Sequence, residues 1–142
     1  MKLQNFKLLS LVGLLLLIFT ISSCSSDDND LNANISVNEG PSGDIGGDFT
    51  GNGGNATRTI SWTNNLSTAD YNADITAASN GTFQIVVADA NGDVVLDATL
   101  NGNTEPDSID GVTNSGEPGT WTVTIMINNF DGDGSYSLSE GD

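Results

Sequence analysis

Histidine is absent from this 142-residue chain, and cysteine occurs once, at Cys24. Without histidine there is no usual general base, no Ser-His or Cys-His nucleophile pair, and almost no way to build a catalytic zinc site. A single cysteine also excludes an intrachain disulfide. A carboxylate pair of the glycosidase kind stays formally open, but it needs a cleft, and about 90 ordered residues make only a small core. The composition therefore predicts that the protein is not an enzyme.

Basic residues are nearly as scarce as cysteine. Lys2 and Lys7 precede Cys24, so Arg58 is the only basic residue after it, and Arg58 against 19 acidic residues leaves a formal charge of −18. Nucleic acid and anionic membranes are bound through Lys and Arg, so this charge excludes nucleic acid as a partner. It attracts hard cations such as Ca²⁺, although the need for a soluble surface is the simpler explanation of this charge.

The first 23 residues have the order of a secretory signal. Lys2 and Lys7 are followed by an apolar run of 14 residues, Leu8 to Ile21, and then by small residues. A bilayer-spanning helix needs roughly 20 apolar residues, so we expect a signal peptide over residues 1–23. The sequence Ile21-Ser22-Ser23-Cys24 resembles a bacterial lipobox. That resemblance implies cleavage before Cys24 and lipidation of Cys24, for instance with palmitate.

Residues 24–30 form the expected tether of this lipid-anchored chain. Its sequence Ser25-Ser26-Asp27-Asp28-Asn29-Asp30 resembles the export signal of Bacteroidota lipoproteins. The resemblance implies an outer-membrane protein that is anchored by its lipid and faces the cell exterior. A plain solvated linker is the alternative, because charged polar runs are disordered by default.

The rest of the chain, residues 31–142, alternates apolar and polar residues in short runs and shows no helical period. We expect strands over 31–37, 56–63, 71–77, 81–88, 94–100, 121–127 and 136–138, with a further edge strand near Ile109 and Val112. Seven or eight such strands predict an all-β fold, a small antiparallel β-sandwich or jelly roll. The large aromatic residues in these strands are expected in its core.

Two kinds of turn signal divide the strands. Residues 40–54 include seven glycines and Pro41, which predicts a flexible loop. Asn91-Gly92 predicts a tight hairpin between two apolar runs, and Asp131-Gly132-Asp133-Gly134 predicts a second hairpin before the last strand.

Three segments resemble one family when they are taken together. The segment 81–96 runs from an apolar strand into Asp89-Ala90-Asn91-Gly92, the segment 116–123 contains Gly119-Thr120-Trp121-Thr122-Val123, and the segment 134–138 reads Gly-Ser-Tyr-Ser-Leu. This order resembles the pre-peptidase C-terminal β-sandwich, an accessory module of secreted bacterial proteins. The resemblance implies a non-catalytic module, and some members of that family bind calcium or polysaccharide.

Two sets of residues are candidates for sites besides Cys24. Asp131 and Asp133, with Asp89 or Asp93 from the other predicted turn, offer carboxylates for an irregular Ca²⁺ site. The simpler interpretation, which we favour, is that these residues only shape hairpin turns. Asp107-Ser108-Ile109 resembles the O-glycosylation motif of Bacteroidota secreted proteins, which makes Ser108 a candidate for glycosylation.

These observations predict a cell-surface lipoprotein that carries one non-catalytic binding module. Its expected partner is an extracellular glycan or protein, with Ca²⁺ as an optional cofactor. The alternative is a structural or assembly lipoprotein of the outer membrane that binds no small molecule and offers strand edges to a partner. Exposed aromatic residues in a cleft would favour glycan binding, and a long unpaired edge strand would favour assembly.

Overall fold

The computed structural model describes residues 31–40 and 43–141. The expected signal peptide, Cys24 and the tether lie outside these residues. The described part forms eight strands. They are β1 (Asn32–Ile35), β2 (Asn38–Glu39), β3 (Ile45–Asn64), β4 (Ala69–Ala77), β5 (Thr82–Ala88), β6 (Val94–Asn101), β7 (Ser108–Val112) and β8 (Gly119–Glu140). No helix long and apolar enough to cross a membrane occurs within residues 31–40 and 43–141.

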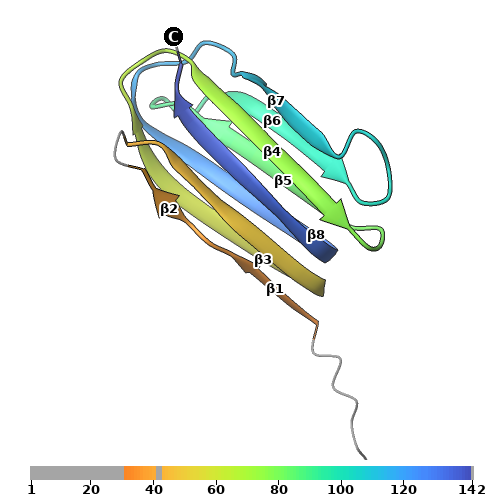
Figure 1. The fold of residues 1–142 in the computed structure, drawn as a ribbon. Coiled ribbons are helices and arrows are strands. Elements are labelled where there is room, and N and C mark those ends of the chain that lie inside the picture. The colour runs from red at the N-terminus through yellow and green to blue at the C-terminus, as the bar shows by residue number, and fades with distance from the viewer. Residues whose placement is uncertain (1–30, 41–42, 142) are drawn as a thin grey trace, which may run out of the picture.

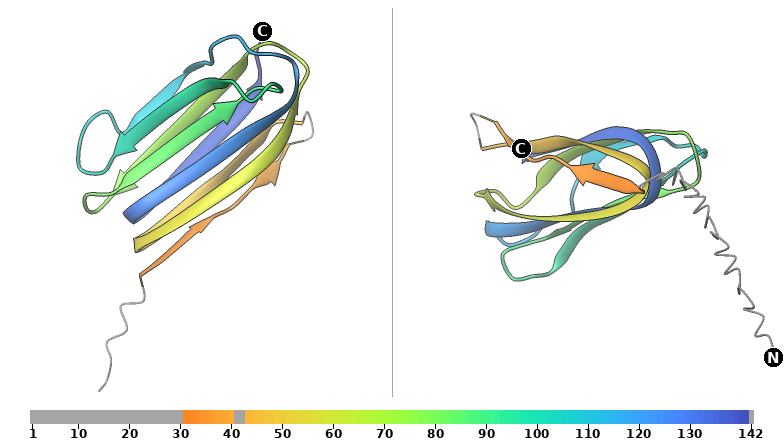
Figure 2. Two further views of the ribbon diagram at one scale, coloured as in Figure 1. Left: turned by 180° about the vertical axis from the view of Figure 1, so that it is seen from behind. Right: turned by 90° about the horizontal axis from the view of Figure 1, so that it is seen from below.

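The strands form two antiparallel layers that share their two longest members, β3 and β8 (Figures 1 and 2). In the first layer, the N-terminal half of β3 and the C-terminal half of β8 lie between β1 and β2 on one side and β4 and β7 on the other. In the second layer, the C-terminal half of β3 pairs with the N-terminal half of β8, followed by β5 and β6. The prediction of a small all-β sandwich is therefore confirmed.

The two long strands pass from one layer to the other at a corner. Their pairing register shifts between Asn52 and Ala56 of β3, and Gly53 there has a φ of 71°. On β8 the corner contains Asn129, with a φ of 47°. Left-handed residues of this kind occur at bulges, which bend a strand and increase its twist.

The predicted hairpin at Asp131–Gly134 is wrong, because β8 bends at this corner and does not reverse direction. These residues lie inside β8, which runs without reversal from Gly119 to Glu140 and stays paired with both β3 and β4. Here the Gly-containing sequence accompanies a bend of one strand rather than a turn between two.

The predicted loop over residues 40–54 is wrong for its larger part, because β3 begins at Ile45. Four glycines of this strand, Gly46, Gly47, Gly51 and Gly54, lie where neighbouring backbone leaves no room for a Cβ atom. Tyr136 pairs with Gly47 and extends to donate a hydrogen bond from its hydroxyl to the Ser36 carbonyl at 2.8 Å. Phe49 pairs with Gly134, and a Cβ atom on Gly134 would overlap the Phe49 ring. Glycine is therefore a packing residue in this sheet, as in other aromatic-glycine strand pairs.

The core between the layers is rich in aromatic side chains, as the alternation predicts. Phe49 stacks on Phe83 with ring centroids 4.6 Å apart and meets Phe130 edge to face at 5.4 Å. Trp62 and Trp121 are direct cross-strand partners and pack edge to face at 6.0 Å. Burial of these large rings supplies much of the apolar area that stabilises so small a domain.

Candidate ligand-binding cleft

Asp89, one of the predicted calcium ligands, shapes the turn between β5 and β6. Its Oδ1 accepts hydrogen bonds from the backbone N–H groups of Asn91 and Asp93, each at 2.9 Å, and its Oδ2 accepts one from the N–H of Glu117 at 2.7 Å. The Glu117 bond does most to hold the pKa of Asp89 below its ordinary value, although desolvation opposes this shift. The Asp89 side chain is 6% exposed, so both of its oxygens serve the backbone in a buried position. The hairpin predicted at Asn91-Gly92 is confirmed.

Of the other three predicted calcium ligands, only Asp93 lies near Asp89. Asp93 is exposed in the same turn, whereas Asp131 and Asp133 lie on β8 between β3 and β4. Ala88 pairs with Thr122, and Asp131 lies nine residues further along β8, or roughly 30 Å of strand. The structure does not bring the two pairs together. Within the described residues, no group of three or more acidic, cysteine or histidine side chains is placed to hold a metal ion.

The remaining sequence candidates are also located. Ser108 is the first residue of β7 and is exposed, so its glycosylation stays a prediction. Trp62 and Trp121 are 3% and 0% exposed. The Trp62 indole N–H donates to the Gly43 carbonyl, and the Trp121 indole N–H donates to the Glu117 carbonyl, each at 2.8 Å. These two rings are core residues and form no surface platform for a sugar.

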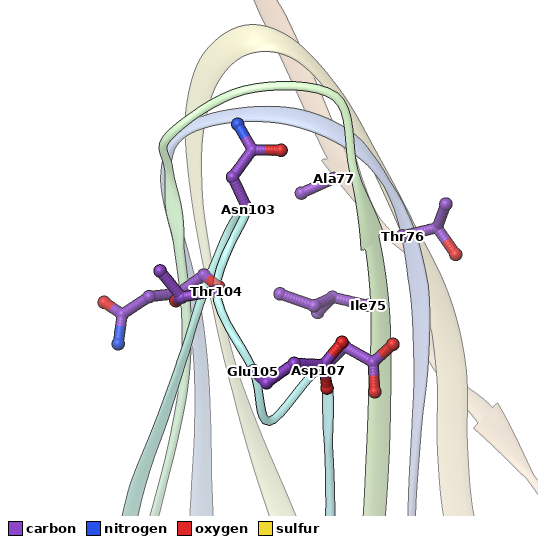
Figure 3. Close-up of a pocket in the computed structure, with 8 residues that line it drawn as sticks. Ile75, Thr76, Ala77, Asn103, Thr104, Glu105 and Asp107 are labelled. Atoms are coloured by element: carbon purple, nitrogen blue, oxygen red, sulfur yellow. The ribbon is translucent and has the colours of Figure 1, made fainter.

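A cleft opens at the end of the sandwich where β6 leads into β7. One cavity, of about 270 Å³, lies between the end of β4 and the β6–β7 loop. Figure 3 shows Ile75 and Ala77 pointing from β4 toward this loop, while Thr76 points away. Polar side chains line the loop side of the cavity, namely those of Asn101, Asn103, Thr104, Glu105 and Asp107.

A second cavity, of about 380 Å³, lies beside the first, and Asn101 and Thr104 line both. Its other walls come from the β4–β5 loop and from the corner of β8, and consist of Asn80, Gly81, Thr82, Gly102, Asn128 and Asn129. Because the two cavities share Asn101 and Thr104, we consider them together as one candidate site, which we call the asparagine cleft.

Backbone contacts hold the loops around the asparagine cleft in place. The Gly102 N–H donates to the Gly81 carbonyl at 2.8 Å, and the Ile75 N–H donates to the Asp107 carbonyl at 2.8 Å. The Thr104 hydroxyl donates to the Asn101 carbonyl at 3.0 Å. A Cβ atom on Gly102 would overlap the Ser79 carbonyl, so glycine is required for the two loops to approach. The cleft is thus supported by its own backbone, and within the described residues the side-chain amides of its lining make no hydrogen bond to the protein.

The chemistry of the asparagine cleft suits a neutral, hydroxyl-rich ligand. Side-chain amides both donate and accept hydrogen bonds, and hydroxyl groups do the same. Glu105 and Asp107 add negative charge, and no Lys or Arg lines either cavity. Sequence reasoning missed this cleft because its asparagines look like ordinary turn residues. Only the folding of the β4–β5 loop, the β6–β7 loop and the β8 corner onto one another brings them together.

Comparison with known proteins yields neither a matching family model nor a matching curated protein. Among solved structures, TmCBM61 in complex with beta-1,4-galactotriose is similar at 9% identity and a TM-score of 0.40, over 80% of this chain and 90% of that one. The N-terminal cellulose-binding domain of Cellulomonas fimi beta-1,4-glucanase C is similar at 15% identity and a TM-score of 0.36, over 78% and 79%.

A third similar structure is the family 11 carbohydrate-binding module from Clostridium thermocellum in complex with a beta-1,3-1,4-mixed-linked tetrasaccharide. Its identity is 11% and its TM-score 0.36, over 79% of this chain and 84% of that one. At such identities the class of this protein, a small antiparallel β-sandwich, rests on its own two layers of strands.

Proposed function

We propose that this chain is a cell-surface lipoprotein whose β-sandwich is a non-catalytic module that binds neutral extracellular glycan in the asparagine cleft. One observation carries the proposal. Two adjoining cavities of about 270 and 380 Å³ are lined by amide and hydroxyl side chains, and pockets for small ligands are typically about 300–1,000 Å³. Ile75 and Ala77 supply a small apolar wall on which the C–H face of a sugar ring can pack.

The charge of the cleft supports a neutral sugar over an acidic one. Glu105 and Asp107 would repel a uronate or sulfate group, and neither cavity has a cationic side chain to offset them. Both carboxylates are exposed, unlike the buried general acid of a glycosidase. Binding without chemistry is therefore the role that this cleft fits best.

No aromatic side chain lines either cavity, so the exposed aromatic residues that would favour glycan binding are missing here. The proposal rests on the amide and hydroxyl lining alone, and this sets the expected strength of binding. Hydrogen bonds to sugar hydroxyls replace bonds to water, so each adds only about 0.5–1.5 kcal/mol. We expect dissociation constants on the order of 0.1–1 mM, or roughly −5 kcal/mol. Several anchored copies on one surface would raise the effective affinity for a polymer that presents repeated units.

The test uses the chain from Ser25 onward, without the lipid-bearing cysteine. Its binding to a panel of neutral and uronate-containing polysaccharides is measured by affinity electrophoresis and calorimetry. The double substitution Asn101→Ala and Asn128→Ala removes two amides from the cleft, and Asn34→Ala with Asn72→Ala removes two exposed amides from strands elsewhere.

We expect retention by at least one neutral polysaccharide, a loss of tenfold or more in the cleft variant, and a change under twofold in the control. Retention by uronate polymers alone, or equal binding by the cleft variant and the parent chain, would contradict the proposal.

A further inference from the structure

The C-terminal half of β3 is an open sheet edge. From Ala56 to Asn64 this strand pairs with β8 on one side, and no described strand pairs with it on the other, since β1 and β2 pair with β3 only between Ile45 and Gly53. An unpaired row of backbone N–H and C=O groups is a template for a further strand.

This edge, residues 56–64, lacks most of the devices that usually protect an edge from pairing. It contains no proline, and its register with β8 is unbroken from Ala56 to Asn64. The other outer strands are shorter, interrupted or charged: β7 has five residues, the pairing breaks between β1 and β2, and β6 has eight residues and carries the exposed Asp97. Charged side chains and bulges normally block edges, so this one is unusually accessible to a partner.

Charge also sets this edge apart from the rest of the protein. Residues 49–69 contain no Asp or Glu in a chain that has 19 of them, and they contain Arg58, the only basic residue after Cys24. The outward side chains are exposed hydroxyls, those of Thr57, Thr59, Ser61 and Thr63. Hydroxyl side chains pair favourably across strands.

A small cavity of about 210 Å³ adjoins the C-terminal part of this edge. It is lined by Ser61, Trp62 and Thr63 of β3 and by Glu39, Gly43 and Ile45 opposite them. The bond from the Trp62 indole to the Gly43 carbonyl holds the two walls together. Trp62 and Ile45 are almost fully buried, whereas Glu39 is exposed at the rim. The cavity therefore combines an apolar floor with one carboxylate.

We propose that the edge 56–64 binds an extended segment of another protein as an added β-strand, with a Lys or Arg side chain of that segment in the Glu39 cavity. Backbone hydrogen bonds along an edge give affinity, and a side-chain pocket beside it gives specificity. The aliphatic stem of a Lys or Arg packs on apolar surface while its charged end stays at the rim, here beside Glu39. The net charge of −18 after Cys24 further attracts a basic partner.

Arg58 makes the two ends of this edge different in charge. It lies four residues from Trp62, or roughly 13 Å along the strand, and repels a second cation at that end. The basic side chain of the partner is therefore directed to the Glu39 end, which selects one register over the others. A second copy of this chain is not the expected occupant, because after Cys24 it has no Lys and its only Arg lies on its own edge.

The binding test uses the chain from Ser25 onward and a synthetic peptide probe, acetyl-Ser-Val-Thr-Lys-Thr-Val-Ser-amide. Its control peptide has norleucine in place of the Lys. Backbone amide NMR shifts are followed during each titration. We expect saturable shifts at residues 57–63 with the Lys peptide and at least fivefold weaker binding of the control peptide. Absence of saturable shifts at these residues, or equal binding of the two peptides, would overturn the proposal.

Two substitutions of exposed residues test the roles of the charges. Glu39→Gln is expected to weaken binding of the Lys peptide at least fivefold, whereas Glu105→Gln in the asparagine cleft leaves the affinity for this peptide unchanged. Arg58→Gln is expected to improve binding of a peptide that carries a second Lys four residues from the first. Equal effects of the two glutamate substitutions would show that only overall charge matters. Because the asparagine cleft is lined by other residues, failure of this proposal and failure of glycan binding are seen separately.

Discussion

Truncation of Phe49 tests whether the glycine-rich segment is part of the core. The Phe49 side chain is 1% exposed, stacks on Phe83 at 4.6 Å and contacts Phe130 at 5.4 Å. Replacing a buried Phe by Ala costs about 3–5 kcal/mol in proteins, through lost burial and the cavity left behind. The vacated volume in this case lies over Gly134, which has no side chain to fill it. We therefore expect Phe49→Ala to destabilise the domain by about 4 kcal/mol.

The assay is urea unfolding of the chain from Ser25 onward, followed by the fluorescence of its two buried tryptophans. With an m-value of about 1.5–2 kcal/mol/M, a loss of this size lowers the midpoint by about 2–3 M. Phe49→Leu keeps an apolar side chain but loses both ring contacts, and we expect about 1–2 kcal/mol. Thr50→Ala, at the next and exposed position, should change stability by under about 0.5 kcal/mol. If Phe49→Ala matched Thr50→Ala, residues 45–54 would be a linker after all.

Three further predictions concern Asp89, calcium and the lipid anchor. Asp89→Asn should destabilise the domain more than Asp93→Asn in the same turn. Folding lowers the pKa of Asp89 from its ordinary value of 3.8. The ionised Asp89 side chain therefore stabilises the fold above about pH 4, and this contribution is lost as the pH falls through the folded-state pKa. The unfolding midpoints of the parent and Asp89→Asn should converge in acid. The thermal midpoint should be the same within about 2 °C in millimolar calcium and in EDTA, because no cluster of carboxylates in the described residues is placed to hold the ion. Calcium bound at a hundredfold excess over Kd would add about 2.7 kcal/mol, so a rise of about 10 °C in calcium would show that a calcium site exists. Cys24→Ala in a bacterial host should abolish palmitate labelling and membrane retention, and retention of either would refute lipidation.

Several strands could be predicted from the sequence because their alternation has one buried face. Phe83, Ile85 and Val87 are all fully buried in β5, and Trp121, Val123, Ile125 and Ile127 are fully buried in β8. Period-2 alternation is a local property and survives whatever the partner strands are. The Asn91-Gly92 hairpin is equally local, since its backbone geometry depends on the turn residues themselves.

The first half of β3 could not be predicted because the cause of its glycines is not local. Gly47 and Gly51 look like loop residues until the carbonyl of Ser36, 11 positions earlier, and that of Phe130, 79 positions later, are placed against them. The bend of β8 also has a cause that is not local in the sequence. Asp131-Gly132-Asp133-Gly134 has turn composition, and only its pairing with β3 and β4 shows a continuous strand. The asparagine cleft follows from these features, since it needs the corner of β8 beside the β6–β7 loop.

The most direct test of the central claim is a backbone amide NMR titration of the chain from Ser25 onward with a neutral oligosaccharide from the best-retained polysaccharide. The account predicts saturable shifts confined to the asparagine cleft, at residues 75–77, 80–82, 101–107 and 128–129. Saturable shifts centred on another surface, or no shifts at millimolar concentrations of any neutral oligosaccharide tested, would contradict it.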